Sequence, residues 1–226
     1  MGEDHLGEGH RARLRQRLFD GGGDALLDHE LLEYLLTLSI RRGDTKAIAK
    51  RLIDAFGSFG AVLTADAKAL ARIGGIGDTS IAAIKIAQAS ALRLLQKQVL
   101  DRPVLSNWQA LLDYLQADMG HLDIERVRVL HLNAKNMLMR DEPISEGSTS
   151  EAAIYVREVV RRAIDLGSAA LIIVHNHPSG DPSPSRQDIA ITRELIAAAK
   201  PLKIQVHDHI IVSASGHKSL RAEGLL

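Results

Sequence analysis

The chain has 226 residues, enough for one large domain or two small ones, and its 46% hydrophobic and 25% charged content is ordinary for a folded protein. Its 28 Lys and Arg residues balance its 28 Asp and Glu residues, so no overall charge draws it to nucleic acid or to a membrane. The absence of cysteine excludes disulfides, a thiolate nucleophile and a cysteine-ligated zinc. No apolar run approaches the roughly 20 residues that span a bilayer, and the polar, acidic first residues do not resemble a secretory signal. We therefore expect a cytoplasmic protein.

Residues 8–97 predict a smaller, all-helical domain. Apolar residues recur there at helical spacing, and no alternating strand pattern interrupts them. One helix is expected over 45–56 and would end at Gly57. The helices are expected to start at aspartates, which cap helix N-termini well: Asp28, Asp44, Asp66 and Asp78.

The pattern changes after a boundary that we place near residue 100. Pro103 cannot continue a helix, and Ser106 followed by Gln109 resembles a capping box that starts a new one. Beyond it, strand and helix patterns alternate: strands are expected over 126–133, 137–140, 169–174 and 203–212, and helices over 151–166 and 185–199. Residues 103–226 are therefore predicted to form an α/β domain, with a mixed sheet flanked by helices.

The stretch His175-Asn176-His177 follows a continuous apolar run and suggests a metal site. Residues two apart on a strand point to the same side, so both imidazoles can bind one ion at the carboxyl end of a buried strand. A turn rich in Pro and Ser leads to Ser185, and Asp188 lies in the first turn of the helix that we expect there. Two imidazoles and one carboxylate leave a tetrahedral zinc one position for water. Zinc acidifies such a water toward neutrality and makes it a nucleophile.

The same residues have a plainer interpretation. Histidines after a strand are often only polar loop residues, and Ser185 with Asp188 is also an ordinary helix-capping box. A second His-x-His, at His207 and His209, has no carboxylate at ligand spacing after it. We expect His207 to be a surface or half-buried residue, and Asp208 with His209 to be structural elements near the site.

The spacing His175-x-His177, seven residues, Ser185-x-x-Asp188 matches the signature of JAMM-type (MPN) zinc metallohydrolases, a family of peptidases and isopeptidases. The longer string HNHPSG, with Thr192 and the segment 208–211 after it, resembles the bacterial RadC family more narrowly. The resemblance covers nearly all of 103–226. It implies a JAMM/MPN-like fold, a bound Zn²⁺ and hydrolysis of amide bonds.

The resemblance also implies roles for two further residues. In JAMM enzymes a glutamate from an earlier strand is the general base, and the matching position is Glu125, directly before the strand expected at 126–133. Glu142, Glu146 and Glu151 fall between that strand and the next helix and stay as alternatives, as does a purely structural Glu125. Ser185 matches the serine that helps to bind the polarised carbonyl oxygen.

The helical half contains a turn that resembles a helix-hairpin-helix motif. In that motif glycines, here Gly75 and Gly77, let backbone N–H groups approach a DNA phosphate. RadC-like proteins carry such a hairpin before the JAMM domain. Ile81 stands where the motif usually has a small residue, and few Lys or Arg flank the turn, so the hairpin is equally consistent with a simple helix connector. Any DNA contact is expected to be weak, independent of sequence and dependent on salt.

These patterns are consistent with three functions. The first is a zinc-dependent metalloprotease or isopeptidase that uses His175, His177, Asp188 and Glu125. The second is a non-enzymatic adaptor, associated with DNA in repair or recombination, that uses the hairpin. Phosphodiester hydrolysis is a third possibility, because a zinc-activated water is not limited to carbonyls.

Overall fold

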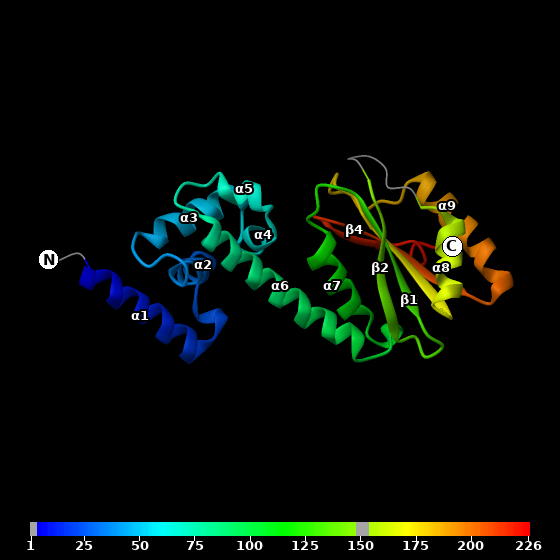
Figure 1. The fold of residues 1–226 in the computed structure, drawn as a ribbon, viewed down its shortest axis with the longest axis horizontal. Helices are drawn as coiled ribbons and strands as arrows, with labels where there is room; N and C mark the ends of the chain where they lie inside the picture. The colour runs from blue at the N-terminus through cyan, green and yellow to red at the C-terminus, as the bar shows by residue number, and fades with distance from the viewer. Residues whose placement is uncertain (1–3, 148–153) are drawn as a thin grey trace. The chain divides into compact units, whose positions relative to one another are not determined.

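The computed structural model of the chain describes residues 4–147 and 154–226. It separates into two compact units that divide between Ala91 and Leu92 (Figure 1). The division lies within helix α6 (Asp78–Leu100), before the predicted boundary near residue 100. The reason is that the last turns of α6 pack with the second unit, where Val99 is part of the hydrophobic core. In the part of the chain that is described, no helix is long and apolar enough to cross a membrane.

The first unit is helical throughout its described residues, as predicted. Its helices are α1 (Asp4–Gly21), α2 (Asp28–Thr37), α3 (Thr45–Phe56), α4 (Phe59–Thr64), α5 (Ala67–Ala71) and the first part of α6, with a short 3₁₀ turn over Gly23–Ala25. Leu32, Leu36 and Leu52 are fully buried in its core, because apolar residues at helical spacing share one face of each helix.

The aspartate caps were predicted partly correctly. Asp44 accepts a hydrogen bond from the backbone N–H of Ala47 at 3.0 Å, and Asp66 caps α5 in the same way. Asp28 and Asp78 are instead the first residues of their helices. The side chain of Asp28 accepts from the N–H of Phe59 at 3.1 Å, so it contacts the start of α4 and not its own helix.

The second unit is a five-stranded mixed sheet with helices on both faces. Its elements are α7 (Trp108–Met119), β1 (Arg126–Leu132), β2 (Leu138–Glu146), α8 (Val156–Asp165), β3 (Ala170–Asn176), α9 (Arg186–Ala199), β4 (Gln205–Ser213) and β5 (Gly216–Ser219), with 3₁₀ turns at Val104–Ser106 and Lys200–Leu202. The strand order is β2-β1-β3-β4-β5. Helix α7 covers one face, and α8 and α9 cover the other (Figure 1). This architecture confirms the predicted α/β domain after a helical one.

Strand β3 lies at the centre of this sheet, and every one of its residues is buried. It pairs antiparallel with β1 and parallel with β4. Parallel neighbours need a crossover connection, and α9 supplies it. The end of β3 and the start of α9 therefore meet at one edge of the sheet.

Three sequence predictions differ from the structure in this unit. Ser106 does not cap α7, because it closes the preceding 3₁₀ turn and its hydroxyl donates to the carbonyl of Pro103. Strand β2 runs well beyond the predicted 137–140 and contains Pro143, which an edge strand tolerates. Helix α8 begins at Val156, later than the predicted 151.

Candidate metal centre

The predicted ligands His175, His177 and Asp188 lie together at this edge of the sheet. The Nε2 atoms of the two imidazoles are 2.9 Å apart. The Asp188 carboxylate lies 3.3 Å from Nε2 of His175 and 3.7 Å from Nε2 of His177. Among the described residues, these three form the group of His, Asp and Glu side chains that could hold a metal ion.

The spacing of these atoms fits a small tetrahedral ion. With metal–ligand bonds of roughly 2.0–2.1 Å, two ligands of a tetrahedral zinc are about 3.3 Å apart. The 2.9 Å between the two Nε2 atoms and the 3.3 Å from Nε2 of His175 to Oδ1 of Asp188 lie near that value, and the other carboxylate oxygen, Oδ2, lies 3.7 Å from Nε2 of His177. Small movements of the side chains would therefore bring all three ligand atoms into bonding distance of one ion.

The tautomer of His177 is set by the loop that follows it. Its Nδ1 lies 2.8 Å from the backbone carbonyl of Asp181, which can only accept a hydrogen bond. Nδ1 therefore carries the proton of the neutral ring, and Nε2 presents its lone pair to the site. The loop is held in turn by Ser213 and Ser215, whose hydroxyls donate to the carbonyl of Gly180.

A relay of hydrogen bonds sets the tautomer of His175. Thr192 donates its hydroxyl proton to the carbonyl of Asp188 at 2.5 Å, so its oxygen accepts from Nδ1 of His209 at 2.6 Å. Nε2 of His209 must then accept, which places the proton of His175 on Nδ1, 2.8 Å away. The lone pair on Nε2 of His175 thus points toward that of His177. Two lone pairs beside a carboxylate form an electron-rich site that a cation would neutralise.

The electrostatics agree with this assignment. Burial lowers the pKa of His175 to about 4 and lowers that of His209 as well, so both rings are neutral at physiological pH. The Asp188 carboxylate raises the pKa of His177. Burial on its own would raise the pKa of Asp188, but His177, His175 and Ser185 together hold it well below its usual range. The buried His175 is therefore neutral and Asp188 anionic, whereas the charge of Asp188 favours a protonated His177, whose Nε2 proton a cation bound at this position would replace.

The relay predicts a measurable effect of Thr192→Val. The substitution keeps the shape of the side chain but removes the hydroxyl, so His209 loses the acceptor that sets its tautomer. We expect the affinity for Zn²⁺, measured by competition with a chromophoric chelator, to fall by about 10- to 100-fold. Thr192→Ser keeps the hydroxyl and should restore most of it. Equal affinities for the Val variant and the unmodified protein would contradict the relay.

Ser185 and Asp188 also form the helix cap that was considered as an alternative. The Ser185 hydroxyl accepts from the N–H of Asp188 at 3.1 Å, and one carboxylate oxygen of Asp188 accepts from the N–H of Ser185 at 2.7 Å. The other carboxylate oxygen is the one that lies 3.3 Å from His175. The capping oxygen, Oδ2, is also the one that lies 3.7 Å from His177, so Oδ1 is the oxygen that could bind a metal while Oδ2 keeps the cap.

Glu125 lies beside the ligands without joining their cluster. Val127 pairs with His175 across β1 and β3, so the register extended by two residues places Glu125 opposite His177. Its negative charge contributes to the raised pKa of His177. This is the position that a general base next to the metal would need.

The alternative glutamates are placed differently. Glu142 pairs with Val129 further along the sheet, and both of its oxygens accept from Nε of Arg162, at 2.9 and 2.8 Å. It is therefore committed to an ion pair away from the ligands. Glu151 and the side chain of Glu146 lie outside what the structure describes.

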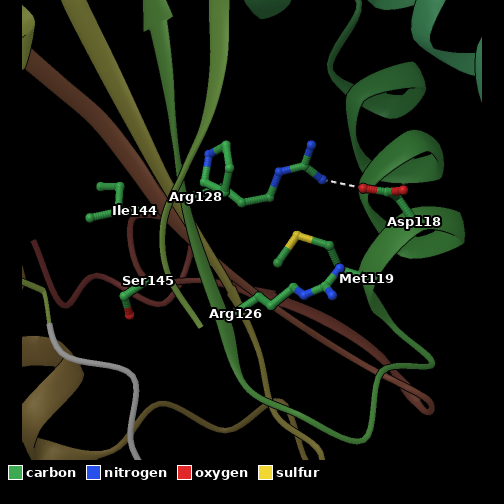
Figure 2. Close-up of a pocket in the computed structure, with 7 residues that line it drawn as sticks. Asp118, Met119, Arg126, Arg128, Ile144 and Ser145 are labelled. Carbon is green, nitrogen blue, oxygen red and sulfur yellow. Dashed lines mark hydrogen bonds and ion pairs between the residues drawn. The ribbon is translucent and has the colours of Figure 1, made fainter. Parts of the chain in front are cut away.

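A pocket of about 400 Å³ lies on the α7 side of the sheet, where β1 begins (Figure 2). It is lined by Asp118, Met119, Arg126, Arg128, Pro143, Ile144 and Ser145. Arg128 is ion-paired with Asp118 and with Asp141, so its charge is already balanced within the unit. The pocket is a hollow directly beside the segment that carries Glu125.

The second His-x-His does not form a pair of ligands. A bulge in the pairing of β3 with β4 interrupts the alternation at His207. Nε2 of His207 lies 2.7 Å from the side-chain oxygen of Asn136, whereas His209 faces His175 and Thr192. His207 is half-buried, as predicted, and Asp208 holds the turn after β5 through Ser219.

The two hairpin glycines belong to the other unit, and they differ from each other. Gly75 has a φ of +90°, which strains any other residue, and a Cβ there would lie 3.0 Å from the side chain of Ile48, so the local fold accounts for this glycine without DNA. Gly77 has neither restriction. Of the four arginines in 10–17, Arg17 pairs with Glu30 and Arg11 donates to the carbonyl of Arg41, which are contacts within the unit.

Comparison with known proteins finds relatives of both units. Residues 105–225 match the model of the RadC-like JAB domain, and residues 9–82 match the UPF0758 N-terminal domain. The chain belongs to the RadC family. A UPF0758 protein of Rhodobacter capsulatus is 48% identical over 213 residues, which cover 94% of this chain and all of that protein. A UPF0758 protein of Ruegeria pomeroyi is 46% identical over 217 residues, which cover 96% and 97%. This RadC chain is thus similar to its relatives in both units.

Sequence reasoning missed one polar residue of this RadC site. Asn176, inside the His-Asn-His motif, is buried and hydrogen-bonded to the first residue of β1 and to the segment before it. One signal in the sequence could have indicated it: the asparagine follows Ile172 and Val174 on the same face of the strand, where a buried amide needs hydrogen-bond partners. The contact of His209 with His175 was anticipated only as proximity.

Proposed function

We propose that this RadC protein is a zinc-dependent hydrolase that cleaves an amide bond in a peptide or an isopeptide. The observation that supports this proposal is that the Nε2 lone pairs of His175 and His177 and the carboxylate of Asp188 converge on one point. Hydrogen bonds from outside this cluster set the tautomers of both histidines. Outer partners of this kind are typical of ligands that bind a metal. A set of two nitrogens and one oxygen suits zinc and leaves a position for water.

In this proposal each residue has a defined task. His175, His177 and Asp188 would hold the ion. When bound, the ion would acidify a water and polarise the scissile carbonyl. Glu125 would take a proton from the attacking water as its oxygen adds to the carbonyl carbon, and would give that proton to the leaving amine as the C–N bond breaks. Ser185 orients the carbonyl oxygen with its hydroxyl proton, which remains available because its oxygen only accepts in the helix cap.

The direct test uses the purified full chain and a panel of substrates. Metal analysis should give about one zinc per chain. Peptides, isopeptide-linked conjugates and a phosphodiester are then incubated with the zinc-loaded protein, and new amines or phosphates are measured. We expect release of amines that a chelator abolishes and added Zn²⁺ restores. Cleavage of the phosphodiester alone would contradict an amide hydrolase.

The DNA-associated adaptor remains a separate prediction, which the hairpin motif alone supports. A scaffold has no need of three ligands with set tautomers, so the complete ligand set favours the enzyme. Gly77 offers the clean test of DNA contact, because a side chain there meets no neighbouring atom. If the hairpin contacts DNA, Gly77→Val should weaken binding at low salt by about tenfold, with only the small loss of stability that a poorer residue at the start of α6 causes. Unchanged binding would exclude this contact. Gly75 is unsuitable, because its replacement disturbs packing against Ile48.

A further inference from the structure

Asn176 separates the two histidine ligands but faces the opposite side of the sheet. Successive residues of a strand alternate between faces, so the side chain points toward the α7 side, where Ile172 and Val174 form part of the core. It is only 1% exposed. An amide in such a place is costly unless its hydrogen bonds are made.

The amide of Asn176 binds the backbone around Glu125. Its oxygen accepts from the N–H of Arg126 at 2.8 Å. Its nitrogen donates to the carbonyl of Ile124 at 3.1 Å and to that of Leu122 at 3.2 Å. The Ile124 carbonyl and the Arg126 N–H belong to the two peptide groups on either side of Glu125. One side chain therefore holds both peptide groups that orient the Glu125 backbone.

We propose that Asn176 is a positioning residue that sets Glu125 against the metal ligands, an inference that rests on the proposed function. Asn176 lies between His175 and His177 at the end of the same strand. Its hydrogen bond to Arg126 therefore fixes a segment 50 residues earlier in the chain relative to the two ligands. The base and the ligands come from different strands, and a shift of about 1 Å between such groups can cost 100-fold in rate. The hydrogen bonds of the Asn176 side-chain amide restrict such a shift of Glu125 relative to the ligands.

The role requires an amide of this length. It must accept one hydrogen bond and donate two, which an aspartate carboxylate cannot do because it only accepts. Leucine has a similar volume but does neither. Glutamine has the right groups on a chain that is one methylene too long for a packed interior.

The experiment compares Asn176→Asp and Asn176→Leu with a control that loses a buried hydrogen bond elsewhere. Ser168→Ala is that control, because Ser168 is buried and lies 2.9 Å from His131, distant from the ligands in the register of β1 and β3. Three properties are measured on the full chain: zinc content, hydrogen–deuterium exchange of the amides of 122–126, and the kcat and KM of hydrolysis.

We expect both Asn176 variants to keep about one zinc, because all three ligands remain. Exchange in 122–126 should accelerate at least about tenfold, and kcat should fall by about 10- to 100-fold while KM changes little. Ser168→Ala should leave exchange in that segment and kcat near the values of the unmodified protein, even if its melting temperature falls. A kcat within about twofold of normal in both Asn176 variants would overturn the proposal.

Failure of the proposed function gives a different result. If the unmodified protein binds zinc but releases no amine, the hydrolase proposal fails. The exchange measurement still tests whether the hydrogen bonds of Asn176 hold the backbone on both sides of Glu125. Exchange that accelerates in the Asn176 variants but not in Ser168→Ala would support this positioning role of Asn176. Unchanged exchange in the Asn176 variants would overturn it.

Discussion

Asp188→Asn is expected to abolish stoichiometric zinc binding and, with it, hydrolysis. The carboxylate supplies the only formal negative charge among the three proposed ligands, and one of its oxygens lies 3.3 Å from Nε2 of His175. A neutral amide is a much weaker ligand, so we expect the affinity for Zn²⁺ to fall by more than the roughly 10- to 100-fold that outer-sphere changes cost. Isothermal titration of the chelator-treated protein with Zn²⁺ measures this directly.

The chain contains a matched control for this substitution. Asp181→Asn changes an aspartate in the loop before α9 whose side chain accepts from the N–H of Ser183, while its backbone carbonyl continues to hold His177. Asparagine at 188 can still accept from the N–H of Ser185, so the start of α9 should persist. Zinc binding of normal affinity in the Asp188 variant would remove this residue from the ligand set and contradict the proposed centre.

Glu125→Gln is expected to have the opposite combination of effects: normal zinc content and a loss of about 10²- to 10⁴-fold in kcat. Glutamine has the size of glutamate and can form hydrogen bonds, but it cannot take a proton from water. The pairing of Val127 with His175 places the residue opposite His177, and it stands outside the ligand cluster. Metal analysis and steady-state kinetics on one preparation separate the two effects.

The control for Glu125 is Glu142→Gln. The sequence left Glu142 as an alternative general base. In the structure it is ion-paired with Arg162, so it should be dispensable for hydrolysis. Loss of zinc in Glu125→Gln would reassign this residue as a ligand. Full activity in that variant would instead transfer the proton role to another group.

Much of this protein follows from local patterns in the sequence. The helical periodicity before residue 98 and the alternating elements after 125 predicted a helical unit followed by an α/β unit, because these periodicities determine which faces must be buried. The ligand set was accessible for a similar reason. His175 and His177 stand two apart at a strand end, and Asp188 stands in the first turn of the next helix, so their proximity needs little more than one strand, one turn and one helix.

Contacts between distant segments were decided only by the tertiary structure. Asp28 seemed a helix cap, but it contacts the N–H of Phe59, 31 residues later. The resemblance favoured Glu125 as the base, but only the registers of β1 with β2 and β3 place Glu142 away from the ligands. The hydrogen bond between Asn176 and the N–H of Arg126 likewise joins residues that are 50 apart in the chain. Hydrogen bonds of this kind leave no periodic signal, because they depend on which strands pair and in which register. The sequence alone determined which residues could bind a metal, and the pairing of the strands decided which residues orient them.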